Sequence, residues 1–253
     1  MYRGPNLTPI LKADANVRTV YVHEIVFHPS TGEVEVVSRL VPVTDAIPTD
    51  STTNRVVQNW LEVGFAGFRE GGFQPDELVT TADVPLDGLE ASVRTRPTAL
   101  TEVITRSMLA EVPDADGAIL NSGSIRIDDV LPPGPITQYD VIRVLPFGGP
   151  VVEVEMRGSL LERVLNEGLS NRGGGGYLQL AGIQQDPSGA WQVKARPLDA
   201  TATYRIAISD FLITGREQGL DFLNPDHPDL VIGVRHRDIR QTVIEELQRT
   251  FSN

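Results

Sequence analysis

The change of hydrophobic period at Ser51 limits the possible folds more than any other feature of this sequence. Before it, residues 17–28 and 33–43 alternate and are rich in β-branched and aromatic side chains, with a Pro/Ser/Gly cluster at 29–32 between them. Alternation interrupted by turn residues predicts a β-hairpin. After Ser51, apolar residues recur every three or four positions, which predicts an amphipathic helix that ends at the Gly-Gly pair 71–72.

Beyond this helix, helical and strand-like segments are mixed. Helices are expected at 98–112, 137–144, 159–169 and 239–251, and strands at 117–120, 151–156, 177–183, 191–195 and 204–208. The second of these helices opens with a capping-box pattern, Thr137-x-x-Asp140. The mixture predicts an α/β fold (α+β mixed) with mixed sheets flanked by helices, preceded by the hairpin and a linker helix. We expect residues 1–48 to contain the hairpin, residues 49–74 the linker helix and residues 75–253 the mixed α/β domain.

Composition excludes several classes of function. The chain has 253 residues and a formal net charge of −12, which argues against a nucleic-acid partner because phosphate contacts need a basic surface. A few arginines can still bind a small anion. With no cysteine, thiolate catalysis and zinc–thiolate sites are ruled out. No apolar run approaches the roughly 18–20 residues of a membrane span, and the first six residues contain no signal-peptide core.

Motifs for catalysis or metal binding are weak throughout. None of the four histidines lies in a metal-binding motif, and the acidic pairs at 114/116 and 128/129 lie in loop-like sequence, so structural or surface roles are favoured. Ser122 follows a strand but has neither a GxSxG elbow nor a suitably placed histidine. The glycine run 173–176 lacks the Lys-Ser/Thr of a phosphate-binding loop; it is either a flexible loop or a place where backbone approaches a flat ligand.

Two segments have features of a binding site. Residues 121–126 (NSGSIR) form a glycine-bearing turn after an apolar strand, which can present backbone N–H groups and one arginine to an anion. In residues 146–149 (PFGG), Phe147 is flanked by flexible neighbours that cannot bury it, so it could serve as a stacking platform. Taken alone, each segment favours the plainer interpretation of an ordinary turn or a core phenylalanine.

Five motifs taken in order give a more specific indication. They are SVRTRPTAL, AILNSGSIR, GPITQYDVIRVLPFGG, GYLQLAGI and YRIAISDFLITGREQG, and over roughly residues 78–225 they resemble the C-terminal domain of 5′-nucleotidases. The preceding KADANVRTVYVH and its hairpin resemble the last strands of the same family's metallophosphoesterase domain. That domain's metal-binding motifs, of the types DxH, GNHE and GHxH, are absent from this sequence.

The resemblance implies a nucleotide or nucleoside ligand. The positions that match the family's binding residues are Arg94, Asn121, Gly123, Arg126, Phe147, Phe211 and Glu217. Phe147 and Phe211 match the two aromatics that hold the base between them, and both arginines match groups that meet the substrate's anionic part. Asn121 and Gly123 match the turn lining the base and ribose pocket, and Glu217 matches an Asp that accepts from ribose hydroxyls.

The resemblance also implies a partner. In the family, two divalent metals in the metallophosphoesterase domain activate the attacking water, so this chain is expected to hold no cofactor, to lack phosphatase activity by itself and to work with that domain in cis or in trans. The family's usual location is periplasmic, cell-surface or secreted. Alternatives are a stand-alone, non-catalytic binding or surface protein and an enzyme with an unrelated site of its own.

Two departures from the family pattern leave the substrate open. The usual GGDG after the second phenylalanine is GREQG at 215–219, which puts the ribose contact in doubt. The helix after Arg94 carries Thr101-Glu102 and Arg106-Ser107 where the family has Gly-Asn and Asp-Ala. Nucleoside monophosphates, nucleotide sugars and cyclic nucleotides all remain candidates.

Overall fold

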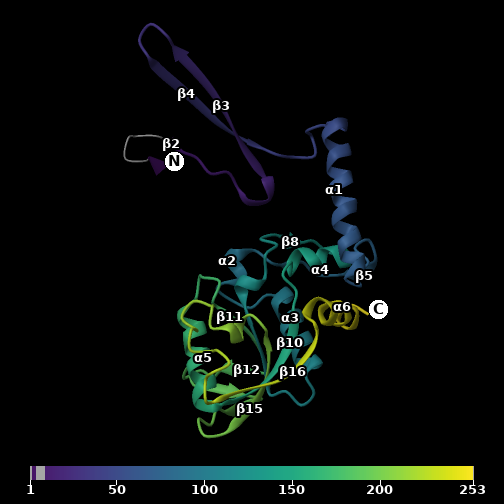
Figure 1. Ribbon diagram of the computed structural model, residues 1–253, viewed down its shortest axis with the longest axis vertical. Helices are drawn as coiled ribbons and strands as arrows, with labels where there is room; N and C mark the ends of the chain where they lie inside the picture. Colours follow the sequence, from purple (N-terminus) through teal and green to yellow (C-terminus); the bar gives the residue numbers. More distant parts are fainter. Residues whose placement is uncertain (1, 4–8, 253) are drawn as a thin grey trace. The chain divides into compact units, whose positions relative to one another are not determined.

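The computed structural model describes residues 2, 3 and 9–252 and divides the chain into two compact units, residues 1–64 and 65–253 (Figure 1). The prediction about the first six residues falls largely on positions outside the described part. Each unit is considered by itself below.

The predicted hairpin is present in the first unit as β3 (Thr19–His28) and β4 (Glu33–Pro42), which pair antiparallel along their whole length (Figure 1). Gly32, in the turn, has a φ of 72°, a conformation that glycine adopts without strain. Directly paired residues share a face, so the pairs Ile25–Val36 and Phe27–Val34 make one face of the ribbon apolar. Three short elements precede the hairpin: β1 (Tyr2–Arg3), β2 (Pro9–Ile10) and the 3-10 turn η1 (Ala15–Val17).

The helix predicted after Ser51 is α1 (Ser51–Glu70), as the hydrophobic period indicated. It begins after Asp50, whose side chain accepts a hydrogen bond from the Thr53 N–H at 2.7 Å. It ends in a Schellman motif: Gly72 has a φ of 86°, and the Phe73 N–H donates to the Phe68 carbonyl at 3.0 Å. The glycine pair therefore terminates this helix for the reason expected.

A five-stranded mixed sheet forms the centre of the second unit, in the order β11-β7-β15-β10-β16. Only the pairing of β7 with β15 is parallel among the described strands of this sheet. The strands of the unit are β5 (Leu78–Ala82), β6 (Leu86–Asp87), β7 (Gly117–Asn121), β8 (Val130–Leu131), β9 (Gly134–Thr137), β10 (Pro150–Arg157), β11 (Leu178–Ala181), β12 (Ile183–Gln185), β13 (Trp191–Val193), β14 (Arg196–Pro197), β15 (Thr203–Ser209) and β16 (Leu230–Asp238).

Helices cover both faces of this sheet. The helices are α2 (Glu90–Val93), α3 (Ala99–Glu111), α4 (Gln138–Val144), α5 (Gly158–Ser170) and α6 (Ile239–Thr250), with 3-10 turns η2 (Ser122–Ser124) and η3 (Leu212–Thr214). Successive strand residues enter different cores: Leu120 packs with α3 and α6, whereas its neighbour Ile119 packs with α5. The sheet is therefore the middle layer of three, which confirms the predicted mixed α/β class.

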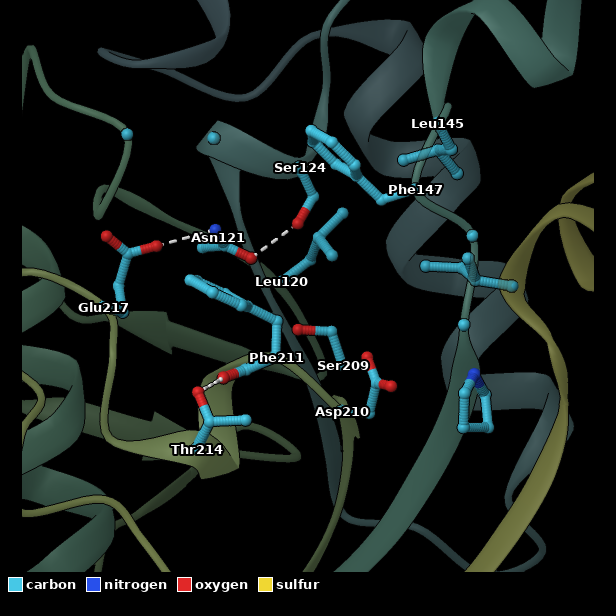
Figure 2. Close-up of a pocket in the computed structure, with 16 residues that line it drawn as sticks. Leu120, Asn121, Ser124, Leu145, Phe147, Ser209, Asp210, Phe211, Thr214 and Glu217 are labelled. Atoms are coloured by element: carbon cyan, nitrogen blue, oxygen red, sulfur yellow. Dashed lines mark hydrogen bonds between the residues drawn. The ribbon is translucent and has the colours of Figure 1, made fainter.

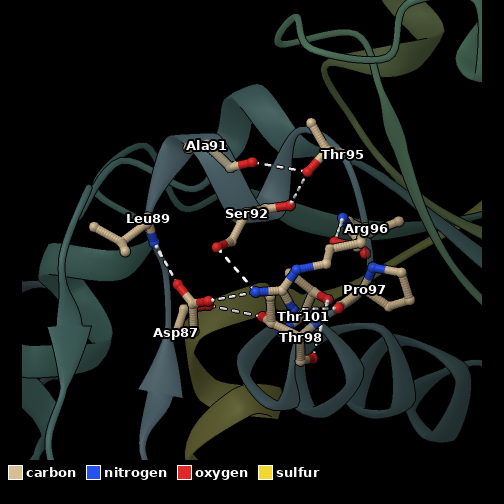
Figure 3. A network of polar contacts seen from close by, with 10 residues as sticks. Asp87, Leu89, Ala91, Ser92, Thr95, Arg96, Pro97, Thr98 and Thr101 are labelled. Atoms are coloured by element: carbon tan, nitrogen blue, oxygen red, sulfur yellow. Dashed lines mark hydrogen bonds and ion pairs between the residues drawn. The ribbon is translucent and has the colours of Figure 1, made fainter.

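The start of α3 is fixed by a polar network that also holds the segment carrying Arg94 (Figure 3). Thr98 is the N-cap of a capping box, in which its hydroxyl accepts from the Thr101 N–H and the Thr101 hydroxyl accepts from the Thr98 N–H. Thr98 also donates to the Asp87 carbonyl at 2.7 Å, and Arg96 pairs with the Asp87 carboxylate at 3.1 Å. Thr101, one of the departures from the family pattern, thus has a structural role here.

Some strands differ from the prediction because their pairing partners are distant in sequence. The expected strand 177–183 is split at Gly182, whose φ of 72° turns the chain out of β11 and into the three-stranded sheet β12-β13-β14. The strand β16 was not predicted, because it pairs with β10 through two register shifts and has an irregular apolar pattern. The short strands β5, β6, β8 and β9 and the single-turn α2 were not predicted either.

Arg237 joins β16 to two helices. Its guanidinium pairs with Glu111 of α3 at 2.7 Å and with Glu245 of α6 at 2.5 Å. Hydrogen bonds from Arg237 hold the pKa of Glu111 below its ordinary value, although burial opposes the shift. A depressed folded-state pKa means that the pair stabilises the fold above the unfolded carboxyl's pKa of about 4.3, and that this stability is lost as pH falls through the lower folded value.

We therefore expect Arg237→Gln to lower the free energy of unfolding at pH 7 by about 0.5–1 kcal/mol, a modest amount because Arg237 is half exposed. The difference between variant and wild type should shrink as pH is lowered below about 4.3, the pKa of the unfolded carboxyl group. Urea unfolding of both proteins at several pH values measures it. A difference in the free energy of unfolding that does not change with pH would show that the ion pairs of Arg237 do not stabilise the fold.

Candidate functional site

Three neighbouring strands bring the predicted binding segments to one edge of the central sheet. Parallel pairing places the ends of β7 and β15 together, so that Asn121 and Asp210 lie at the same level. The antiparallel β10 begins at this edge, because Val151 pairs with Ser209. The turn after β7, the loop before β10 and the loop after β15 therefore meet, although they lie far apart in sequence.

A cavity of about 560 Å³ opens at this edge (Figure 2). Its volume is within the roughly 300–1,000 Å³ usual for small-molecule sites. Its wall combines aliphatic and aromatic side chains, glycine backbone and a few polar groups. The lining residues are Leu120, Asn121, Gly123, Ser124, Leu145, Phe147, Gly148, Gly149, Pro150, Gly175, Ser209, Asp210, Phe211, Thr214, Glu217 and Ile239.

Two phenylalanines are the most exposed apolar groups of this wall. Phe147 is 72% exposed and Phe211 is 40% exposed, and Figure 2 shows them reaching the cavity from different loops. No ring–ring contact joins them among the described residues. Burial of a phenylalanine is favourable, so two exposed rings at one cavity leave apolar surface that a flat ligand can cover.

Asn121, which is 3% exposed, is at the centre of a group of hydrogen-bonded polar residues in the cavity wall. Its amide nitrogen donates to Glu217 at 2.6 Å, and its amide oxygen accepts from the Ser124 hydroxyl at 2.7 Å (Figure 2). Glu217 also accepts from the Gln218 N–H at 2.9 Å. These bonds fix both groups, and the remaining acceptor positions of Glu217 can receive hydroxyl groups of a ligand.

The glycine run 173–176 packs against the turn after β7. The Gly123 N–H donates to the Gly175 carbonyl at 2.8 Å, and a side chain at Gly123 would place its Cβ 3.2 Å from that oxygen. Ser122 is fully buried, and its hydroxyl donates to the carbonyls of Gly174 and Gly175. Ser122 is thus engaged structurally, and Gly175 brings backbone to the cavity wall.

The two predicted arginines lie outside the lining set. Arg126 is exposed, with its guanidinium carbon 5.8 Å from the centroid of the Phe147 ring, so it borders the aromatic side of the cavity. Arg94 pairs with Glu90 at 2.5 Å, and its carbonyl accepts from the Gly173 N–H at 2.7 Å. The structure therefore places Arg126 beside Phe147 at the cavity, whereas Arg94 contacts the glycine run at Gly173.

Three polar residues of the wall lie outside the predicted binding segments, Ser209, Asp210 and Thr214, and a fourth, Ser124, lies in the predicted turn 121–126 but had no role assigned to it. The Ser209 hydroxyl is buried and has no hydrogen-bond partner among the described residues. Asp210 packs closely against Gly149, where an added Cβ would lie 2.9 Å from its carboxylate oxygen. The sequence contained a usable signal, because Ser209 and Asp210 directly follow a predicted strand and precede Phe211.

The remaining candidate residues have ordinary contacts. Asp116 binds the Arg205 N–H and the Lys194 ammonium, each at 2.9 Å, and Asp128 accepts from the Glu90 N–H at 3.0 Å. Among residues 2, 3 and 9–252, no cluster of three or more acidic or histidine side chains could ligate a metal ion. No helix within this same part of the chain has the length and apolar character needed to cross a membrane.

The fold is thus a three-layer α/β domain with an aromatic-walled cavity at the ends of its central strands. Residues 78–224 match the family model described as 5′-nucleotidase, C-terminal domain. The chain belongs to this family.

Individual relatives agree with this assignment. The chain is 32% identical over 171 residues to the trifunctional nucleotide phosphoesterase protein YfkN of Bacillus subtilis, covering 60% of this chain and 12% of that protein. It is 29% identical over 212 residues to protein UshA of Yersinia enterocolitica, covering 77% of this chain and 38% of UshA. A solved 5′-nucleotidase precursor from Thermus thermophilus superposes with a TM-score of 0.77 at 25% identity, covering 99% of this chain and 51% of the other. The chain thus spans about half or less of each relative.

Proposed function

We propose that this chain recognises nucleosides and nucleotides in the cavity, as the substrate-recognition domain of a 5′-nucleotidase-type phosphoester hydrolase. The observation that carries the proposal is the pair of exposed rings, Phe147 and Phe211, in a cavity whose wall also holds the fixed Asn121–Glu217 pair. Aromatic rings bind the faces of any nucleobase by stacking, and a carboxylate accepts hydrogen bonds from a vicinal diol. Base and ribose would therefore each meet a suitable group in the wall of this cavity.

Phosphoester hydrolysis is assigned to a metallophosphoesterase domain that acts in cis or in trans. The relatives' printed names include a nucleotide phosphoesterase and 5′-nucleotidases, and the chain spans only part of their length. Under this proposal residues 1–48 are the last strands of that domain, 49–74 are the linker and 75–253 recognise the substrate. Two divalent metals would be held by the metallophosphoesterase domain, and the working location would be extracytoplasmic.

Calorimetric titration of this chain with adenosine and with AMP tests the proposal. We expect saturable binding of both ligands, and no phosphate release from AMP when Mg²⁺, Mn²⁺ or Zn²⁺ is added. Arg126, exposed beside Phe147, supplies a positive group for the phosphate, so AMP should bind more tightly than adenosine at low salt. Absence of binding to adenosine, AMP and a panel of other nucleosides would overturn the proposal.

Glu217 should decide whether the ribose hydroxyls contribute to binding. In the wild type, 2′,3′-dideoxyadenosine should bind about 10- to 100-fold more weakly than adenosine, because hydrogen bonds to a charged acceptor are lost. In Glu217→Ala the two nucleosides should bind equally. Calorimetry of both ligands with both proteins measures this, with Glu162→Ala, an exposed carboxylate on α5, as control. Retained discrimination in Glu217→Ala would assign the ribose contact to another residue.

A further inference from the structure

Phe147 must be held in place by its loop, because its own ring is largely exposed. The ring is 72% exposed, so its packing contributes little to its position. The two residues that follow have left-handed backbone conformations, with a φ of 59° at Gly148 and 101° at Gly149. We name residues 147–149 the platform loop. A stacking group on such a flexible sequence gains affinity only if other contacts order it before the ligand arrives.

The start of α6 supplies those contacts. The Gly149 N–H donates to the Asp238 carboxylate at 3.2 Å, and the Gly149 carbonyl accepts from the Ile239 N–H at 2.9 Å. Asp238 is also the N-cap of α6 and accepts from the Arg240 N–H at 2.9 Å. Both backbone groups of Gly149 are therefore bound by the N-terminus of this helix, about 90 residues further along the chain.

Arg240 completes the attachment. Its guanidinium binds both Asp238 oxygens, at 2.9 and 2.8 Å, and both side chains are largely buried. It lies against Gly148 so closely that a Cβ there would be 2.4 Å from Nη2. Arg240 also contacts an aromatic ring: its guanidinium carbon is 4.6 Å from the ring centroid of Phe73, which is 4% exposed. The platform loop is thus connected to Phe73, the residue whose N–H donates to Phe68 in the Schellman motif of α1.

Asp238 remains ionised at neutral pH. Burial by itself would raise the pKa of Asp238, but hydrogen bonds from the Arg240 side chain and backbone and from Gly149 outweigh it and hold the pKa below its ordinary value. A charged, bidentate pair is stronger and more directional than a neutral one.

We infer that Asp238 and Arg240 are positioning residues for base recognition: they hold the platform loop so that Phe147 is ordered before a nucleobase stacks on it. This inference rests on the proposed function of the cavity. Neither residue is required to touch the ligand. If they act only by ordering Phe147, their substitution should affect affinity only when Phe147 is present. A general contribution to folding would affect affinity whether or not Phe147 is present.

A double-mutant cycle distinguishes these two cases. We expect Asp238→Asn and Arg240→Ala each to weaken adenosine binding about tenfold, because ligand binding must then also order the loop. In a Phe147→Ala background the same substitutions should change the Kd by less than about twofold. Arg240→Lys should be intermediate, because an ammonium cannot form the bidentate pair. Arg237→Gln, two residues before α6 and outside the platform loop, is the control and should leave the Kd unchanged.

Incorporating 4-fluorophenylalanine at position 147 gives a readout that needs no ligand. We expect one narrow ¹⁹F resonance in the wild type, and a broadened resonance shifted towards that of an unfolded peptide in Asp238→Asn and Arg240→Ala. Equal losses of affinity with and without Phe147, or an unchanged ¹⁹F spectrum, would overturn the inference. If the wild type binds no nucleoside, the proposed function fails, whereas the ¹⁹F comparison still decides whether the pair orders Phe147.

Discussion

Replacing either cavity phenylalanine with alanine is expected to weaken adenosine binding by about 5- to 150-fold. Stacking on an aromatic side chain contributes about 1–3 kcal/mol per base, which corresponds to this range. Phe147 and Phe211 are exposed at the cavity, so their removal should change the stability of the fold little. Calorimetric titration of Phe147→Ala and Phe211→Ala against the wild type measures the effect.

A matched control exists in the other unit of the chain. Phe27 on β3 is 60% exposed and lies outside the cavity, so Phe27→Ala should bind adenosine as the wild type does. Phe147→Trp should retain binding, because the larger ring still stacks. Two alanine variants with wild-type affinity would show that the base does not lie between these rings, and the residues assigned to the site would have to be set aside.

Leu161→Ala is expected to lower the free energy of unfolding of the second unit by about 2–5 kcal/mol. Leu161 is fully buried on α5, in the core between this helix and the central sheet. Shortening it removes apolar contact and leaves a cavity that the close-packed surroundings fill only partly. The free energy of unfolding of an ordinary domain is about 5–15 kcal/mol, so this single substitution removes a large part of the stability of the unit.

Tryptophan fluorescence can report this unit alone. Trp191 is 9% exposed, and its indole N–H donates to Asn166 of α5 at 2.8 Å, so its emission follows the docking of that helix. In a Trp60→Phe background it is the sole tryptophan, since the sequence has two. Leu169→Ala, on the same helix but 39% exposed, is the control and should cost under about 1 kcal/mol in urea unfolding. Equal destabilisation by both substitutions would contradict the placement of Leu161 in the core.

Much of the secondary structure was predictable because its causes are local. The hairpin follows from alternation on both sides of a turn cluster, and α1 from a helical period that ends at a glycine with a positive φ. The helix α4 begins at the predicted Thr137–Asp140 capping box, with the Thr137 N–H donating to Asp140 at 2.9 Å. In each case the deciding interactions join residues within a few positions of one another, so the sequence contains the whole signal.

The order of the motifs also indicated the family, and the family model agrees with it. Asn121, Gly123, Phe147, Phe211 and Glu217 all line one cavity, as expected of one binding site. The roles assigned to them, and to Arg94 and Arg126, stay predictions that the binding experiments above can test.

Long-range pairing decided the rest. The segment of β16 has an irregular apolar pattern and forms a strand only because it pairs with β10. Ser209 and Asp210 line the cavity only because β15 lies parallel to β7. Asp238 and Arg240 reach the platform loop because α6 starts where β10 begins, with Ile239 bound to Gly149. The sequence by itself determined the helices, turns and motif order that depend on neighbouring residues. The tertiary structure alone decided which distant loops share one edge of the sheet, because that depends on strand register and packing between segments far apart in the chain.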